Sequence, residues 1–540
     1  MNERTTLTTL ILFSAPALAQ GPLPAPPTPP ENPTTPAKAV LGKMLFWDEQ
    51  LSSDGTMACG TCHVPSAGGG DPRIALAPAH PGPDGAFGTP DDLFGSPGMH
   101  RSNAFGHFED DGIFGFDVQA TNRNSPSMIG AAYFEELFWD GRATGEFRDP
   151  VSGAVVIGQG GALESQSLQP ILSDVEMAWS DRSWEAVTSQ LADARPLALA
   201  LDLPADVAAA LVVDATYPEL FGNAFGSTEI TPVRIAFALA AYQRTLVPDE
   251  SKFDRVMRGE TQFTQAEQRG FNAFRAPQSR CNQCHSGTLF SDGEYHNLGL
   301  RPVNEDDGRR SVTGLFSDRG RFKTPSLRNV DLRERFFHSG APTIDSLQQV
   351  MGFYSGDGGP FGANKDPLLN GIAIPPPVGA DIVTFLRTLT DPRVAAETAP
   401  FDRPTLWSER TSPNPSLLGF GEVAGTAGFV PQILATAPPK EGNRGFRVGL
   451  HGALGGSFAV LRAFPISVPA GATTADLRAG LPLAQIVEGS GPGQGHATWV
   501  DADATLPVLV GLSYEAQWWI RDAGATGGIA KTNAIRVAIE

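Results

Sequence analysis

Two copies of the pattern Cys-x-x-Cys-His limit the possible folds of this chain more than any other feature. They are Cys59-Gly-Thr-Cys62-His63 and Cys281-Asn-Gln-Cys284-His285, and they use all four cysteines of the 540-residue sequence. In this pattern the two thiols form thioethers with the vinyl groups of a haem, and the adjacent histidine binds the iron. A zinc site or a pair of disulfides would leave the position of both histidines to chance. We therefore expect two covalently bound c-type haems, with His63 and His285 as proximal ligands.

A helix is predicted just before each haem motif. Apolar residues within 38–46 have helical spacing, and a capping box at Thr264 and Glu267 starts a helix that leads to the second motif. Because a helix followed by a haem motif occurs twice, we expect two related haem domains.

The apolar period changes to two in the last part of the chain, after residue 416. The alternating runs are Phe446, Val448 and Leu450; Tyr514, Ala516, Trp518 and Ile520; and Ile535, Val537 and Ile539. Glycine and proline turns separate these runs, which is typical of an antiparallel β-sandwich. The expected fold is multidomain, with two mainly α-helical cytochrome c-like haem domains followed by an all-β antiparallel sandwich. For the sandwich we expect a structural or partner-binding role.

A chain of this length exceeds one hydrophobic core. The expected boundaries are 1–19 for a signal peptide, 20–37 for a proline-rich linker, 38–250 for the N-terminal haem domain, 251–398 for the C-terminal haem domain, 399–415 for a linker and 416–540 for the sandwich. Arg4, a short apolar run and Ala17-Leu18-Ala19 form the signal pattern, so we expect a mature start near Gln20 and a periplasmic or secreted protein. The apolar run is too short to span a bilayer.

The formal net charge is −19, with no basic run. This argues against binding to nucleic acid or to an anionic membrane. It suits a small electron-donor protein with a basic rim, such as a cytochrome c or a cupredoxin. The sequence leaves a monomer and a homodimer both open.

Residues 68–119 form a long segment rich in Gly, Pro and Asp. Its stretch from Asp84 to Asp92 has oxygen spacing that suits calcium, but a turn-rich surface loop is the favoured interpretation. His80, His100 and His107 lie in the same segment and are candidates for a sixth ligand of the first iron.

Several motifs occur in an order that resembles the bacterial dihaem cytochrome c peroxidases, a family that includes MauG. They are GKMLFWDEQLSSDGTMACGTCH at 42–63, FWDGRA at 138–143, LESQ at 163–166, VEM at 175–177, GRR at 308–310, FKTPSLRN at 322–329 and HSG at 338–340. The resemblance covers about 39–392 and leaves the sandwich outside it.

The resemblance implies a division of labour between the haems. The haem on His63 would be peroxidatic, and the haem on His285 would receive electrons from a donor. Trp139 would lie between them and carry the electron. Glu176 would be the distal acid/base group, with Gln166 as its neighbour.

The resemblance also implies further cofactor contacts. Arg328 and His338 belong to motifs that would contact haem. Asn124, with backbone carbonyls near Thr324 and Pro325, would hold one calcium ion.

The sixth ligand of the second iron departs from the commonest pattern of the family, which has a methionine there, whereas MauG has a tyrosine. A helix predicted over 346–354 carries both Met351 and Tyr354 on one face. Aligning Ser346-Leu347 with the family favours Tyr354. An apolar stripe without an iron ligand is the third possibility.

Three functions are consistent with these motifs. The leading expectation is a peroxidase that reduces hydrogen peroxide to water with electrons from the small donor. The alternatives are a MauG-like oxidase of side chains in a partner protein and a non-catalytic electron-transfer cytochrome.

Overall fold

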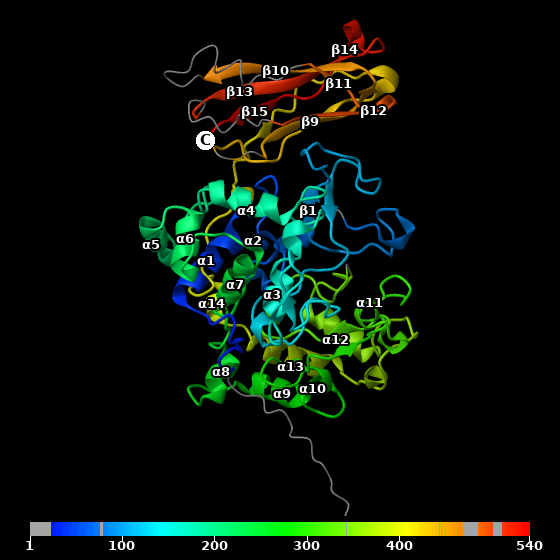
Figure 1. Cartoon of the computed structure of the whole chain (residues 1–540). Coiled ribbons are helices and arrows are strands. Elements are labelled where there is room, and N and C mark those ends of the chain that lie inside the picture. The colour runs from blue at the N-terminus through cyan, green and yellow to red at the C-terminus, as the bar shows by residue number, and fades with distance from the viewer. Residues whose placement is uncertain are drawn as a thin grey trace, which may run out of the picture.

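The structure is a computed structural model that describes residues 23–75, 79–341, 343–441, 443, 445–467, 484–500 and 510–540. The expected signal peptide and its cleavage before Gln20 lie outside the described residues. Figure 1 shows a helical body with a β-sandwich at one end. Within the described part of the chain, no helix combines the length and the apolar character needed to cross a membrane.

The first haem domain is built around a helix crossing. Its helices are α1 (Pro36–Trp47), α2 (Cys59–Cys62), α3 (Ala162–Ser167), α4 (Trp184–Asp193), α5 (Ala205–Val213), α6 (Tyr217–Phe225) and α7 (Pro232–Gln243). Its short hairpins pair β1 (Pro97–His100) with β2 (Val118–Ala120) and β3 (Phe147–Arg148) with β4 (Val155–Ile157). A Cβ on Gly42 of α1 would lie 1.9 Å from the carbonyl oxygen of Ala238 on α7. Glycine is therefore needed where α1 crosses α7.

The second haem domain repeats this construction. Its helices are α8 (Lys252–Met257), α9 (Gln265–Phe274), α10 (Cys281–Cys284), α11 (Arg310–Thr313), α12 (Leu347–Ser355), α13 (Pro376–Arg387) and α14 (Pro392–Ala395), and β5 (Tyr295–His296) pairs with β6 (Phe322–Lys323). A Cβ on Gly270 of α9 would lie 1.9 Å from the carbonyl oxygen of Asp381 on α13. In both domains the helix before the haem motif thus crosses a later helix at a glycine.

The C-terminal part forms two antiparallel sheets. One has the order β12 (Gly491–Val500), β9 (Arg447–Gly455), β8 (Gln432–Leu434). The other has the order β11 (Gln485–Ile486), β10 (Phe458–Ser467), β13 (Ser513–Arg521), β15 (Ile535–Ala538), β7 (Ser416–Leu417), with β14 (Ile529–Lys531) also paired to β13. The residues of the three alternating runs are all buried, and most of them form the core between the sheets. The indole N–H of Trp518 donates to the carbonyl of Gly449 across this core over 3.1 Å.

Both expected linkers are packed against the first haem domain. In the proline-rich segment, Asn32 is fully buried and donates to the Glu164 carboxylate over 2.8 Å. In the segment 399–415, Phe401 and Leu406 are buried in the core of the first haem domain. Side chains of both segments therefore pack on the first haem domain.

Candidate active site

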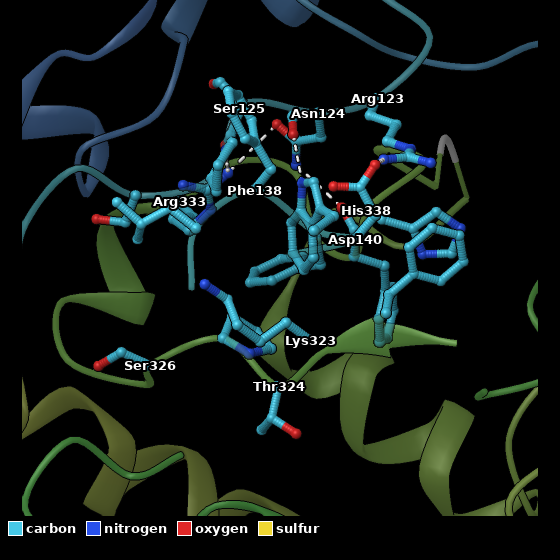
Figure 2. Close-up of a pocket in the computed structure, with 18 of the residues that line it drawn as sticks. Arg123, Asn124, Ser125, Phe138, Asp140, Lys323, Thr324, Ser326, Arg333 and His338 are labelled. Carbon is cyan, nitrogen blue, oxygen red and sulfur yellow. Dashed lines mark hydrogen bonds and ion pairs between the residues drawn. The ribbon is translucent and has the colours of Figure 1, made fainter. Parts of the chain in front are cut away.

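Both haem motifs open into one cavity of about 820 Å³. Its lining includes the four cysteines, the two motif histidines and Trp139 between the two domains. Side chains from the first domain, such as Asn124 and Asp140, face side chains from the second, such as Lys323 and His338 (Figure 2). The cavity is therefore shared by the two domains.

The two motif histidines are oriented in the same way. The Nδ1 atom of His63 is 3.0 Å from the carbonyl oxygen of Gly69, and that of His285 is 2.9 Å from the carbonyl oxygen of Phe290. Because each Nδ1 donates to a carbonyl, each Nε2 is left to bind a metal. Burial lowers the pKa of both histidines, which keeps the rings neutral, as metal ligation requires.

The first haem motif packs closely against the end of α1. A Cβ on Gly60, inside the motif, would lie 2.1 Å from the ring of Trp47, so the indole lies directly on the motif backbone. The indole N–H of Trp47 in turn donates to the hydroxyl of Tyr242 on α7 over 3.1 Å. The motif is thereby fixed to the α1–α7 crossing.

Two cationic side chains in the cavity, one buried and one half-buried, fit the carboxylates of a haem. Lys323 and Arg333 both line it, and neither forms an ion pair with a carboxylate among the residues that the structure describes. Burial lowers the pKa of Lys323 to about 7 and that of Arg333 to about 10, and Arg333 Nη1 has no hydrogen-bond partner. Figure 2 shows both side chains around the same part of the cavity. Haem propionates would supply the missing negative charge, so these residues fit the expected cofactor.

The expected acid/base pair lines the same cavity. Glu176 and Gln166 are both among the lining residues, together with Cys59 and Cys62 of the first motif. Burial raises the pKa of Glu176, and the Arg142 guanidinium and the Ser173 hydroxyl oppose this shift. A half-buried carboxyl group with a raised pKa suits proton transfer in such a cavity.

Trp139 lies where the two haem domains meet. It is buried, and its indole N–H donates to the carbonyl of Asn124 over 2.7 Å. Its own carbonyl accepts from the backbone N–H of Lys323 over 2.8 Å. The ring centroid is 6.3 Å from that of His338. Trp139 therefore contacts the second haem domain through its backbone and its ring.

Arg123 is a site residue that the sequence analysis missed. It forms ion pairs with Asp140 at 2.6 Å and Asp306 at 2.7 Å, and so joins the two domains beside Trp139. Lys323 was missed too, although it stands in the FKTPSLRN motif. Arginines are frequent in any sequence, and no local sequence pattern marks Arg123 as a site residue.

Arg328 and His338 differ in their surroundings. Both guanidinium nitrogens of Arg328 reach the carboxylate of Asp254 at 2.9 Å, in an ion pair that is almost fully buried. These bonds hold α8 against the rest of the second domain, and a haem contact by Arg328 stays a prediction. The His338 ring stacks on Phe322 with centroids 3.5 Å apart and lines the cavity, and burial lowers its pKa to about 3.

The expected calcium ligands already have protein partners. The side-chain oxygen of Asn124 accepts from Arg333 Nη2 over 3.2 Å, and the carbonyl of Thr324 accepts from the Ser291 hydroxyl over 2.7 Å. Calcium at Asn124 stays a prediction. In the other stretch, the Asp91 and Asp92 carboxylates accept from the N–H groups of Asp84 and Gly88, as expected for a turn-rich loop.

Of the three loop histidines, His80 lines the cavity. The Nδ1 atom of His80 accepts from the backbone N–H of Gly82 over 3.2 Å. His100 Nδ1 is 2.8 Å from the carbonyl oxygen of Phe116 in the hairpin loop. The sixth ligand of the first iron, including a role for His107, stays a prediction.

Met351 and Tyr354 both line the cavity from α12. The Cβ of Met351 points toward Gly379 on α13, since a Cβ built on that glycine would lie 3.3 Å from it. Tyr354 packs edge-on against Phe337. Burial raises the pKa of Tyr354 strongly, and the nearby thiols of the second haem motif act in the same direction. Both side chains therefore stay candidates for the sixth ligand of the second iron.

Comparison with known proteins agrees with this geometry. Residues 36–262 match the family described as di-haem cytochrome c peroxidase. The cytochrome-c peroxidase IdrP1 of Pseudomonas sp. (strain SCT) is 28% identical over 71% of this chain and 90% of its own length. The methylamine utilization protein MauG of Methylorubrum extorquens is 30% identical over 67% of this chain and 81% of its own length.

A solved structure described as a MauG-like protein associated with microbial copper homeostasis is also similar. It superposes with a TM-score of 0.50 at 25% identity, and the alignment covers 74% of this chain and 98% of that one. Relatives named as peroxidases and relatives named as MauG thus both match. From its paired haem motifs and these relatives, the chain belongs to the di-haem cytochrome c peroxidase family that includes MauG, and this membership implies two c-type haems.

Proposed function

We propose that this protein reduces hydrogen peroxide to water in the periplasm or outside the cell, with electrons from a small redox protein. The observation that supports this most is Glu176, a half-buried carboxyl group with a raised pKa in the same cavity as the first haem motif. Haem, when bound, supplies the redox-active iron that this reaction needs. The overall reaction takes one peroxide, two electrons and two protons and gives two waters.

Glu176 moves the protons in this proposal. Its carboxylate oxygen accepts a proton from one peroxide oxygen and returns it to the other, so that the departing oxygen leaves as water. Gln166, in the same lining, orients the peroxide by hydrogen bonding. Trp139 bridges the domains between the site that receives electrons and the site that uses them.

The test is peroxide turnover with reduced cytochrome c in wild type and in Glu176→Gln. We expect the variant to keep both haems and to lose about 100- to 10,000-fold in turnover, because general acid/base groups contribute on that scale. Absence of turnover in wild type, with normal electron transfer between the haems, would favour the non-catalytic cytochrome instead.

A second function is favoured by Tyr354. If this tyrosine, rather than Met351, binds the second iron, the phenolate stabilises ferric iron and lowers its potential. A protein with this ligand would be suited to MauG-like oxidation of side chains in a partner protein. Oxidation of a partner by peroxide and this enzyme, without any small donor, would support this second function.

A further inference from the structure

The β-sandwich lies directly on the first haem domain, on the side away from α9 and α10 (Figure 1). A Cβ on Gly445 would lie 2.5 Å from the Cα of Asp54, so the two backbones touch. The backbone N–H of Phe108, in the loop between β1 and β2, donates to the hydroxyl of Thr498 on β12 over 2.9 Å. The sandwich therefore contacts both the turn before the first haem motif and the β1–β2 loop.

Arg447, the first residue of β9, lies at the centre of this contact and is fully buried. Its Nη2 pairs with the Asp54 carboxylate at 2.9 Å. Its Nη1 donates to the Ser102 hydroxyl over 2.5 Å and to the Gly106 carbonyl over 2.7 Å. The guanidinium also stacks on the ring of Phe108, 3.8 Å from its centroid. One side chain of the sandwich thus joins two separate segments of the haem domain.

The first of these segments holds the loop that carries Glu176. The backbone N–H of Ser53 donates to the carbonyl of Met177 over 3.0 Å, and the Ser53 hydroxyl accepts from the N–H of Trp179 over 2.9 Å. Ser53 precedes Asp54, the partner of Arg447. The position of Arg447 is therefore transmitted through one turn to the residues that directly follow Glu176.

The second segment holds the same loop from the other side. The N–H of Ser180 donates to the carbonyl of Ser102 over 2.9 Å. The backbone of Gly106 packs on the indole of Trp179, since a Cβ there would lie 2.5 Å from the ring. The N–H of Met99 on β1 donates to the carbonyl of Val175 over 2.9 Å. Both segments that Arg447 joins thus contact the loop at 173–180.

We propose that the sandwich is part of the active-site framework and that Arg447 is a positioning residue for Glu176. This rests on the proposed function, in which Glu176 moves protons. A planar guanidinium with fixed donor directions suits this task, because it bonds a carboxylate, a hydroxyl and a carbonyl in one geometry. The sandwich then fixes the Glu176 loop relative to the first haem motif, although none of its described residues lines the cavity.

The test compares Arg447→Met with Arg536→Met in the full-length holoprotein. Arg536 is exposed on β15 and pairs with Glu515 on β13. It is therefore a control for the same substitution elsewhere in the sandwich. In Arg447→Met we expect both haems attached and the second haem spectrum unchanged. We expect amide hydrogen exchange in 173–180 to be about tenfold faster and the pH profile of turnover to shift. Arg536→Met should match wild type in each measurement.

Three further variants separate positioning from simple charge burial. Arg447→Met combined with Asp54→Asn removes the unpaired carboxylate, so we expect thermal stability to recover while exchange in 173–180 stays fast. Ser102→Ala removes the hydrogen bonds of the Ser102 hydroxyl with Arg447 and with the His100 carbonyl, and Thr498→Val removes the one with the Phe108 N–H. Neither variant strands a charge, and they serve if Arg447→Met does not fold. Smaller increases in exchange in the same segment are expected in both.

Unchanged exchange in Arg447→Met, or full recovery of exchange in the double variant, would overturn the proposal. The exchange measurement needs no peroxide, so it stays informative if the protein is not a peroxidase. Wild-type turnover in Glu176→Gln would instead refute the proposed function and leave the exchange result to be judged separately.

Discussion

The backbone N–H of Lys323 donates to the carbonyl of Trp139 over 2.8 Å, which joins one residue from each haem domain inside the shared cavity. Trp139 is fixed at its other end too, because its indole N–H donates to the carbonyl of Asn124. An aromatic residue held by both its backbone and its indole is suited to a fixed bridge between two redox centres.

Trp139→Phe should therefore slow electron transfer between the haems while both stay attached. The lost indole hydrogen bond should cost about 1 kcal/mol of stability. Stopped-flow spectroscopy of the two haems measures the transfer. Trp184→Phe, at the start of α4 and partly buried against the first core, is the control and should transfer at the wild-type rate. Unchanged kinetics in Trp139→Phe would mean that the indole only fills space.

The pH dependence of turnover should report Glu176. Because burial raises the pKa of this carboxyl group, its proton-accepting carboxylate is lost at a higher pH than for an exposed glutamate. Turnover should therefore fall as the pH falls through this raised pKa. Steady-state rates measured across the pH range should show this fall at low pH in wild type but not in Glu176→Gln. Glu185→Gln, on the exposed face of α4, should keep it.

Tyr354 and Met351 are distinguished by the spectrum of the ferric protein. With Tyr354 as ligand of the second iron, Tyr354→Phe should change the second haem spectrum and Met351→Leu should leave it unchanged. Ferric thioether ligation gives a weak charge-transfer band in the red. If that band is present, survives Tyr354→Phe and disappears in Met351→Leu, the methionine is the ligand.

Gly42→Ala should destabilise the first haem domain by about 2 kcal/mol, because the added methyl group meets the Ala238 carbonyl. Gly222→Ala is the matched control inside α6, where a Cβ has its nearest neighbour at 3.4 Å. That variant should be neutral or more stable by roughly 0.5–1 kcal/mol. Denaturant unfolding of both holoproteins gives the comparison. Equal stability of the two variants would contradict the tight crossing.

Local sequence patterns predicted much of the architecture. The capping box at Thr264 and Glu267 is present, with Thr264 Oγ1 accepting from the Glu267 N–H. The alternating residues of the last domain are buried on facing sheets. The helix expected at 346–354 is α12, with Ser346 as its N-cap. These features depend on neighbours a few residues apart, which the sequence displays directly.

The tertiary structure alone decided the partners of the buried charges. Arg447 pairs with Asp54 across 393 residues, and Arg328 pairs with Asp254. The packing of both expected linkers on the first haem domain likewise joins segments that are distant in the sequence. Ion pairs and contacts between distant segments depend on how separate elements meet in space, and no local period records that. The sequence by itself therefore determined the haem motifs, the helices and the sandwich, whereas only the fold decided which residues hold Glu176 in its place.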